Sequence, residues 1–406
     1  MESSYFDINQ PPASVGILSA QEAEPKALDR VVPPTPAIRA TPFTPRDPIM
    51  IPPRRWIYGR HYIRQFLTET VAPGAYGKSA LAIAEALAVV TGRPLLGIPP
   101  DERTSVWYWN GEDPHEELER RLAAAYQHYG IDPTETDGLL FVDSGRDQQI
   151  VLAEMTKLGA KIAQPVVDQV IATIRANGIG LLIVDPFVAS HRVTENDNPA
   201  IEMVAAAWAS IANATDCAVE LIHHSRKTGG AEITVEDGRG GSALLAKARS
   251  ARVLNGMTPD EAARAGVENS RSYFRVSNGK ANLSPSSDRA EWYQRLGVEI
   301  GNGDSVVAVT RWEWPNAFDG VTVRDLREVQ AKIAAGRYRE SPQATEWAGN
   351  AVASVLRLDL SNKAHKAKVA SLLKIWIASD ALRVVDGTDE KSMSRKFVEV
   401  GTWAND

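Results

Sequence analysis

Residues 72–79, APGAYGKS, combine a loop of small residues with a lysine and a serine. The pattern G-x-x-x-x-G-K-[ST] is typical of a loop that binds phosphate through backbone N–H groups and the lysine, and Mg²⁺ through the hydroxyl. Here alanine replaces the first glycine, whose main task is to turn the chain. The sequence therefore predicts an ATP and Mg²⁺ site with Ser79 as a metal ligand. Its ATP-binding residues are Ala72, Pro73, Gly74, Ala75, Tyr76, Gly77, Lys78, Ser79 and Ala80.

Two carboxylates follow apolar runs and complete a hydrolytic set with Lys78. Asp185 ends the run LLIVD and is expected to hold Mg²⁺ through water or Ser79. Glu112, in WNGEDPHEELERRL, is expected to orient and deprotonate the attacking water. The alternative for Asp185 is a turn aspartate before Pro186. The alternative for Glu112 is an acid that stabilises the start of a helix.

Two histidines end another apolar run, CAVELIHH. An imidazole beside the Asp185 strand would lie near the γ-phosphate and could sense it, so His223 and His224 are both candidate catalytic residues, one of them being merely packed or solvated. Paired histidines also suggest a metal site. No third ligand lies at a suitable spacing, which argues against that alternative.

The elements that must position these residues are short strands alternating with helical stretches. The runs FLTETV, SVWYWNG, GLLFVDS, GLLIVDP and CAVELIHH are separated by helix-compatible sequence, which predicts an α/β fold with a mostly parallel sheet covered by helices. FLTETV precedes the phosphate-binding loop and SALAIAEALAVVTG follows it. The loop thus has the strand and helix that its chemistry requires.

Composition limits the class of protein. The 406 residues carry a net charge of -6, which gives no global attraction to nucleic acid, so any DNA contact must be local. The single cysteine excludes an internal disulfide framework. No apolar run reaches the ~20 residues of a membrane span, and the start of the chain lacks the form of a signal peptide. We expect a cytoplasmic protein without membrane contact.

Composition shifts also suggest four regions. Residues 1–50 are rich in proline and are expected to be a disordered arm. Residues 51–315 are expected to form the ATPase domain, 316–345 a linker, and 346–406 a winged-helix-like domain. In the last region, Ser361 is expected to cap a helix whose Val369, Leu372, Leu373 and Trp376 face a core, and ALRVVDG and RKFVEVG are expected to pair as a hairpin.

Seven motifs in order resemble the RepA-type branch of the RecA-like ATPases, which includes relatives of plasmid and phage replicative helicases. They are APGAYGKS, WNGEDPHEELERRL, FVDSGRDQ, LLIVDPF, ENDN, LIHHSRK and GRGGSALLAKARSARVL. The resemblance covers about residues 50–315. It implies a RecA-like core, ATP with Mg²⁺, a homo-oligomeric ring, movement on single-stranded DNA, and for Lys78, Ser79, Glu112, Asp185 and the histidines the roles given above.

One position departs from these relatives. Their helicases often carry K-x-R-N-G, whose basic groups reach the nucleotide of the neighbouring subunit, whereas this chain reads RVSNG with Ser277 at the position of the arginine. Arg249, Arg252, Arg239 or Lys280 is expected to supply the missing charge. The alternative for each is a side chain that is solvated or that contacts phosphate.

Two segments are expected to contact DNA. The glycine-rich loop 225–241 carries Arg226, Lys227 and Arg239, which could follow the phosphates of a single strand in a ring channel. The helix near residue 363 carries Lys363, Lys366 and Lys368 and could enter the major groove of a duplex. The alternatives are an ordinary surface loop and a winged helix that binds protein.

The sequence therefore predicts a Mg-ATP-dependent, DNA-associated ATPase, of the helicase or replication and maintenance type. The alternative is a DNA-binding regulator in which ATP switches assembly without significant unwinding. Turnover distinguishes the two, because a motor hydrolyses ATP in response to single strands.

Overall fold

The computed structural model describes residues 39–226, 231–285, 290–389 and 392–405. The chain divides into two compact units, Met1–Pro53 and Arg54–Asp406. In the first unit, residues 39–53 contain neither α-helix nor strand but a short 3-10 helix, η1 (Pro48–Met50), capped by the Asp47 carboxylate. This agrees with its proline content. Most of the expected arm, residues 1–38, lies outside the described residues.

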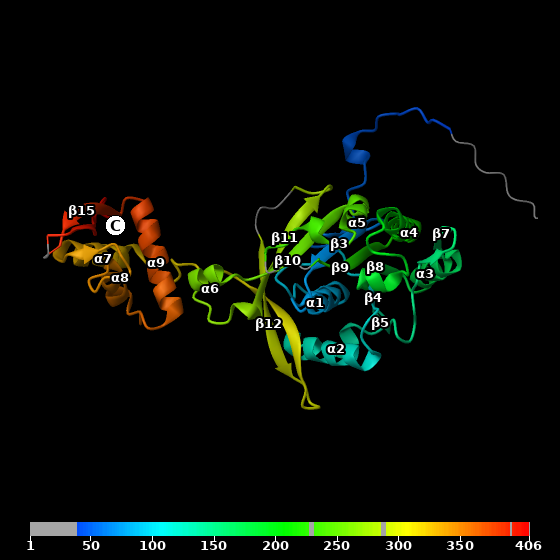
Figure 1. Ribbon diagram of the computed structural model, residues 1–406, viewed down its shortest axis with the longest axis horizontal. Helices are drawn as coiled ribbons and strands as arrows, with labels where there is room; N and C mark the ends of the chain where they lie inside the picture. Colours follow the sequence, from blue (N-terminus) through cyan, green and yellow to red (C-terminus); the bar gives the residue numbers. More distant parts are fainter. Residues whose placement is uncertain (1–38, 227–230, 286–289, 390–391, 406) are drawn as a thin grey trace, which may run out of the picture. The chain divides into compact units, whose positions relative to one another are not determined.

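A nine-stranded sheet is the centre of the second unit (Figure 1). Its strands, in spatial order, are β13 (Ser305–Trp312), β12 (Glu291–Glu299), β11 (Tyr273–Ala281), β10 (Ser250–Gly256), β3 (Leu67–Ala72), β9 (Ala218–His224), β8 (Ile179–Asp185), β4 (Ser105–Asn110) and β5 (Leu140–Ser144). The six strands from β10 to β5 are parallel, and β11, β12 and β13 extend the sheet in antiparallel fashion. The predicted α/β fold with a mostly parallel sheet is confirmed, and the five predicted strands are β3, β4, β5, β8 and β9.

Helices cover both faces of the parallel strands (Figure 1). Alternating residues of β4 show this arrangement, because Val106 and Tyr108 pack with α1 (Lys78–Thr91) and α2 (His115–Tyr129). Trp107 and Trp109 pack on the opposite face, with α3 (Gln164–Ala176), α4 (Asn198–Thr215) and α5 (Gly241–Lys247). Because both faces are buried, β4 and β8 are mostly apolar, whereas β3, β9 and β10 also bury polar side chains, among them Thr70, Glu220 and Arg252.

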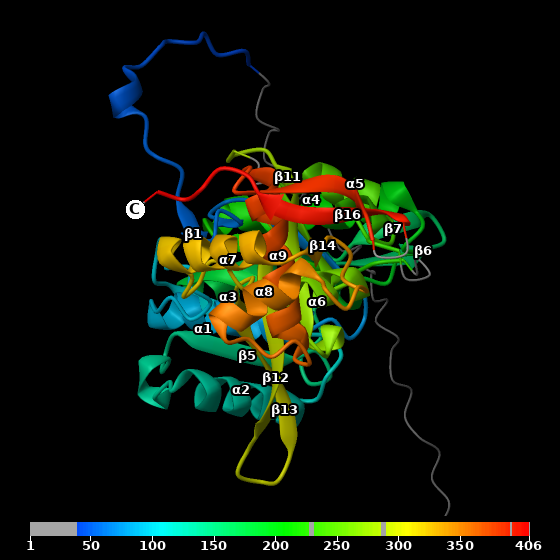
Figure 2. The same ribbon diagram turned by 90° about the vertical axis from the view of Figure 1, so that its left-hand side faces the viewer.

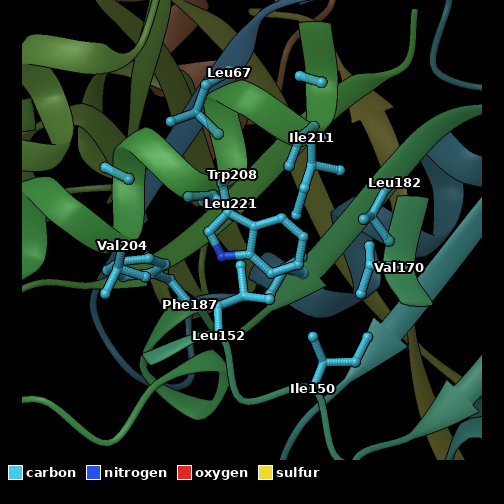
Figure 3. Close-up of a cluster of buried hydrophobic side chains, with 14 of the residues drawn as sticks. Leu67, Ile150, Leu152, Val170, Leu182, Phe187, Val204, Trp208, Ile211 and Leu221 are labelled. Carbon is cyan, nitrogen blue, oxygen red and sulfur yellow. The ribbon is translucent and has the colours of Figure 1, made fainter. Parts of the chain in front are cut away.

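The core beneath α4 centres on Trp208, which is fully buried (Figure 3). Its indole packs among aliphatic side chains of β3, β8, β9 and α4, and its Nε1–H donates to the Ser190 hydroxyl at 3.2 Å. The indole therefore buries a large apolar surface without leaving its polar group unpaired.

Shorter elements surround the sheet. They are the hairpins β1 (Trp56–Tyr58) with β2 (Tyr62–Ile63) and β6 (Ala153–Thr156) with β7 (Gly159–Ile162), the helix α6 (Pro259–Ala265), and the 3-10 helices η2 (Pro133–Glu135), η3 (Phe187–Ser190), η4 (Val235–Asp237) and η5 (Ser270–Ser272). None of the helices in the described ranges has both the length and the apolar character needed to cross a bilayer.

The C-terminal elements, drawn in orange and red in Figure 2, have a hydrophobic core of their own. They are α7 (Val323–Ala335), β14 (Tyr338–Arg339), α8 (Ala348–Leu356), α9 (Lys363–Ala378), β15 (Leu382–Thr388) and β16 (Ser394–Val400). Residues 316–345 were expected to be a linker, and this expectation is wrong. Val329 and Ile333 of α7 are buried in the same core as Trp347 and Trp376, so α7 belongs to the C-terminal elements.

The details of this region match the sequence in part. The hairpin β15–β16 and the buried Val369, Leu372, Leu373 and Trp376 are as predicted. The helix cap is Asn362 rather than Ser361, because the Asn362 side chain accepts the N–H groups of Ala364 and His365. The winged-helix assignment remains a proposal.

Candidate functional site

The carboxyl ends of four parallel strands bring the predicted catalytic residues together. Ala72 at the end of β3 lies opposite His224 at the end of β9, and Asp185 at the end of β8 lies opposite Asn110 at the end of β4. A polar residue that directly follows a buried strand must emerge at this edge. The sheet therefore places the loop, the histidines and both carboxylates on one rim.

The phosphate-binding loop joins β3 to α1. Gly77 precedes the helix with a φ of 86°, a left-handed conformation that glycine adopts without strain, and no side chain caps the helix start. The first N–H groups of a helix have no partner within it. Because no side chain caps the start of α1, those N–H groups suit an anionic ligand.

Lys78 and Asp185 are in direct contact. The buried Lys78 Nζ lies 3.3 Å from Asp185 Oδ1, and the Tyr108 hydroxyl donates to Asp185 Oδ2 at 2.8 Å. The nearby carboxylate raises the pKa of Tyr108 in addition to the larger effect of burial, so Tyr108 remains a donor. This ion pair holds the lysine charge next to the phosphate-binding loop.

Mg²⁺ fits the donors that the site offers. Magnesium prefers oxygen ligands and is usually held by one or two protein groups together with water and substrate phosphates. Ser79 and Asp185 offer a hydroxyl and a carboxylate, and the described residues contain no cluster of three or more His, Cys, Asp or Glu that could hold a metal alone. Their chemistry suits a Mg²⁺ ion that arrives with a nucleotide.

Glu112 lies beside the loop on a short turn between β4 and α2. The Asn110 side chain accepts the backbone N–H groups of Glu112 and Asp113 at 3.0 and 2.8 Å and fixes this turn. The Glu112 side chain is 55% exposed, and its Oε1 lies 3.7 Å from His224 Nε2. Glu112, Lys78, Ser79 and His224 line one cavity of about 910 Å³, the larger cavity.

The two histidines differ in environment. His223 is buried, its Nε2–H donates to the Arg239 carbonyl at 2.6 Å, and burial lowers its pKa to about 4. His224 is partly exposed beside Glu112, and its pKa is lowered by burial and by Lys78. His224 therefore lines the larger cavity beside Glu112, whereas His223 is buried at the carboxyl end of β9.

Residues 33–230, a little under half of the chain, match the family model of the AAA domain. This segment of the chain therefore resembles an AAA domain. Among solved structures, the chain is similar to the RadB recombinase, with 14% identity over 62% of this chain and 93% of that one, and a TM-score of 0.40. It is also similar to a DnaB-like replicative helicase, with 14% identity over 60% of this chain and 59% of the helicase, and a TM-score of 0.44.

A second cavity, the smaller cavity of about 730 Å³, is lined by Pro73, Gly74 and Tyr76 of the phosphate-binding loop. Arg226 and Arg239 line it from the two arms of the loop that follows β9. Gly74 and His224 line both cavities. Lys227, the third predicted DNA contact of this loop, lies outside the described residues.

The basic residues proposed to replace the arginine that is absent at Ser277 do not line the larger cavity. Arg252 is buried, and both of its terminal nitrogens bind the Glu85 carboxylate at 2.6 Å. Arg249 is at the opposite end of β3, where its backbone N–H donates to the Leu67 carbonyl. Lys280 donates to backbone carbonyls of α5. Arg239 pairs with Glu195 at 3.5 Å.

Arg252 is therefore not placed to reach the nucleotide of a neighbouring subunit. Its charge is compensated by Glu85, and its side chain is enclosed between β10, α1 and β2. A charge that must reach a neighbouring subunit has to lie at the surface. The sequence could not show this, because Glu85 is 167 residues away along the chain.

Three residues of the site were missed by sequence reasoning. Tyr108 and Asn110 support Asp185 and the Glu112 turn, and an asparagine just before a helix start is the signal that could have indicated the latter. Arg295 of β12 also lines the larger cavity. No motif surrounds Arg295, and it stands more than 200 residues after the phosphate-binding loop.

The predicted C-terminal lysines lie on α9. Lys363 and Lys366 are exposed, whereas Lys368 is partly buried and its ammonium donates to the Asp319 carbonyl. Two of the three lysines therefore have the exposure that a contact with phosphate requires.

Proposed function

We propose that the protein hydrolyses Mg-ATP in association with DNA. The observation that supports this most is the convergence of Lys78, Ser79 and Glu112 in one cavity, with Asp185 in contact with Lys78. Each of these groups matches a separate requirement of phosphoryl transfer: charge neutralisation, metal binding and water activation.

In the proposed reaction a water oxygen attacks the γ-phosphorus and the bond from that phosphorus to the β–γ bridging oxygen breaks. The water proton passes to the Glu112 carboxylate, and the products are ADP and phosphate. Lys78 leaves Asp185 for the phosphate oxygens, which carry more negative charge than one carboxylate. When bound by Ser79 and Asp185, Mg²⁺ supplies further neutralisation of the phosphate charge.

DNA association is supported by the arginines of the smaller cavity and by the motif resemblance. Arg226 and Arg239 offer contacts to phosphate without base readout, so binding should be salt-sensitive. The α9 lysines would add a duplex contact if the C-terminal elements act as a winged helix. More specifically, we propose that the protein is a ring-forming helicase or a replication and maintenance motor of the plasmid or phage type.

Phosphate release measured with and without single-stranded DNA tests this function. We expect Mg-dependent hydrolysis that rises with single strands and that Lys78→Ala abolishes while the fold persists. A matched control is Lys247→Ala, which removes a lysine of α5 that is paired with Glu202 of α4. ATP binding without hydrolysis in the unaltered protein would contradict the proposal and support the regulator that ATP switches.

A further inference from the structure

Arg295 of β12 lies directly against the phosphate-binding loop of the same chain. Its Nη1 donates to the carbonyl of Ala75, and its Nη2 donates to the carbonyl of Arg271. A Cβ atom built on Gly77 would lie 3.0 Å from Arg295 Cδ. Because Gly77 has no side chain, the Arg295 side chain can lie this close to the loop.

The hairpin that carries Arg295 is held over the cavity by further contacts. At its tip, Asp304 accepts an ion pair from Arg120 of α2, with a distance of 3.1 Å between Nε and Oδ2. Along β13, the Tyr129 hydroxyl donates to the carbonyl of Val309. Arg295 is thus placed by a fixed element rather than by a loop.

The charge of Arg295 is not compensated by a carboxylate. The two other arginines of the larger cavity, Arg120 and Arg121, form ion pairs with acids of α2 and its preceding turn. Arg295 forms no ion pair with any residue in the described parts of the chain, and its Nε is buried without a hydrogen-bond partner. Burial lowers its pKa, as expected for a cation without a counter-ion.

We propose that Arg295 binds the phosphates of the nucleotide in cis and supplies the charge that Ser277 cannot. A guanidinium has five N–H donors in a planar array that matches phosphate oxygens, and only two of these groups are used by the carbonyls. The proposal rests on the proposed ATPase function. It differs from the resemblance in one consequence, because each chain then carries a complete set of charges.

Substitution of Arg295 tests the first part. We expect Arg295→Ala to lower ATP turnover by at least about 100-fold, since an arginine at the transferring phosphoryl group contributes roughly 10³ to 10⁵ in rate. Arg295→Lys should retain more activity than Arg295→Ala, and added guanidinium at millimolar concentration should partly restore Arg295→Ala. The matched control is Arg311→Ala on β13, an arginine that pairs with Glu313 outside the cavity.

Mixing two inactive variants tests the cis assignment. Lys78→Ala chains keep Arg295, and Arg295→Ala chains keep the phosphate-binding loop. If the arginine acted across a subunit interface, mixed assemblies would regain turnover. We expect no recovery, and turnover per chain that does not change with protein concentration.

The outcomes separate this inference from the function on which it depends. An inactive unaltered protein would contradict the ATPase proposal itself. An active protein whose Arg295→Ala variant keeps full turnover would overturn the role of Arg295. Recovery of activity on mixing would overturn the cis assignment and make Arg295 a residue that acts on the neighbouring chain.

Discussion

Glu112 is the residue whose role a single substitution can decide. Its carboxylate is exposed at the edge of the larger cavity and close to His224, as a base that meets water should be. Glu112→Gln keeps the shape and removes the base, so ATP should still bind while hydrolysis falls by roughly 100-fold or more. Single-turnover phosphate release and binding of a fluorescent ATP analogue measure the two effects.

The control for Glu112 is the exposed acid Glu116 in the first turn of α2. Both residues suit the helix dipole, but only Glu112 lines the cavity. Glu116→Gln should hydrolyse ATP normally. Equal rates in the two variants would mean that Glu112 is only a helix-start acid.

Buried histidines should make stability depend on pH. Burial lowers the pKa of His191 and of His223 to about 4. Between about pH 6.5 and pH 4 the unfolded chain binds protons that the folded chain excludes, so the free energy of unfolding should fall as pH falls through this window. Below it both states are protonated and the loss levels off.

Urea unfolding at pH 7, 6 and 5 measures this dependence. The expected loss is on the order of a few kcal/mol in total. His191→Leu keeps an apolar side chain against Phe187 and removes one titrating group, so its stability should depend less steeply on pH. An unchanged slope would show that His191 does not contribute.

At the scale of elements, the network of Arg252 ties the strand next to β3 to the helix that follows the phosphate-binding loop. Arg252 of β10 binds Glu85 of α1, Tyr62 of β2 and Thr70 of β3, and all four residues are buried. Arg252→Ala leaves a buried carboxylate unpaired, which should cost about 3–5 kcal/mol of unfolding free energy. Chemical denaturation with a calorimetric check measures it.

A paired substitution separates this structural role from catalysis. Replacing both charges, as in Arg252→Met with Glu85→Leu, should recover most of the lost stability, because the apolar pair leaves no charge unpaired. Arg249→Ala, an exposed arginine three residues earlier, should lower stability little. If Arg252→Ala folds with full stability but loses ATP turnover, the result would support a role of Arg252 at the nucleotide of a neighbouring subunit.

Five of the six parallel strands could be predicted because each is a short β-rich run next to helix-compatible sequence, and β4, β8 and β9 end in polar residues. Lys78, Asp185, Glu112 and His224 follow from those ends. The antiparallel strands β11 to β13 could not be placed, since their order depends on pairings that local sequence does not encode. Arg295 was missed for that reason, and Arg252 was misassigned because its partner Glu85 is distant in sequence.

At the scale of the whole molecule, the position of α7 changes where the chain can be shortened. Val329 and Ile333 lose their partners if the chain ends at residue 339, so we expect that product to expose apolar surface and to aggregate. A chain ending at residue 316 keeps every catalytic candidate and should hydrolyse ATP. Size-exclusion chromatography and phosphate release compare the two.

The same shortened chain tests the duplex contact. Without Lys363 and Lys366, duplex binding should weaken, and the slope of log K against log salt should fall by about 0.9 for each lost phosphate contact. A salt titration of the full and shortened chains measures this. An unchanged slope would assign the C-terminal elements to protein binding and leave Arg226 and Arg239 as the DNA contacts.

Gly74 and His224 line both cavities, so any ligand that shifts them in one cavity changes the wall of the other. Thermodynamic linkage requires the effect of one ligand on the binding of the other to be reciprocal. If a strand of DNA bound at Arg226 tightens ATP binding by some factor, ATP must tighten DNA binding by the same factor. If ATP is hydrolysed as proposed, loss of the γ-phosphate from the larger cavity would then lower the affinity for DNA in the smaller cavity. The two residues that the cavities share would thus couple ATP hydrolysis to the binding and release of DNA.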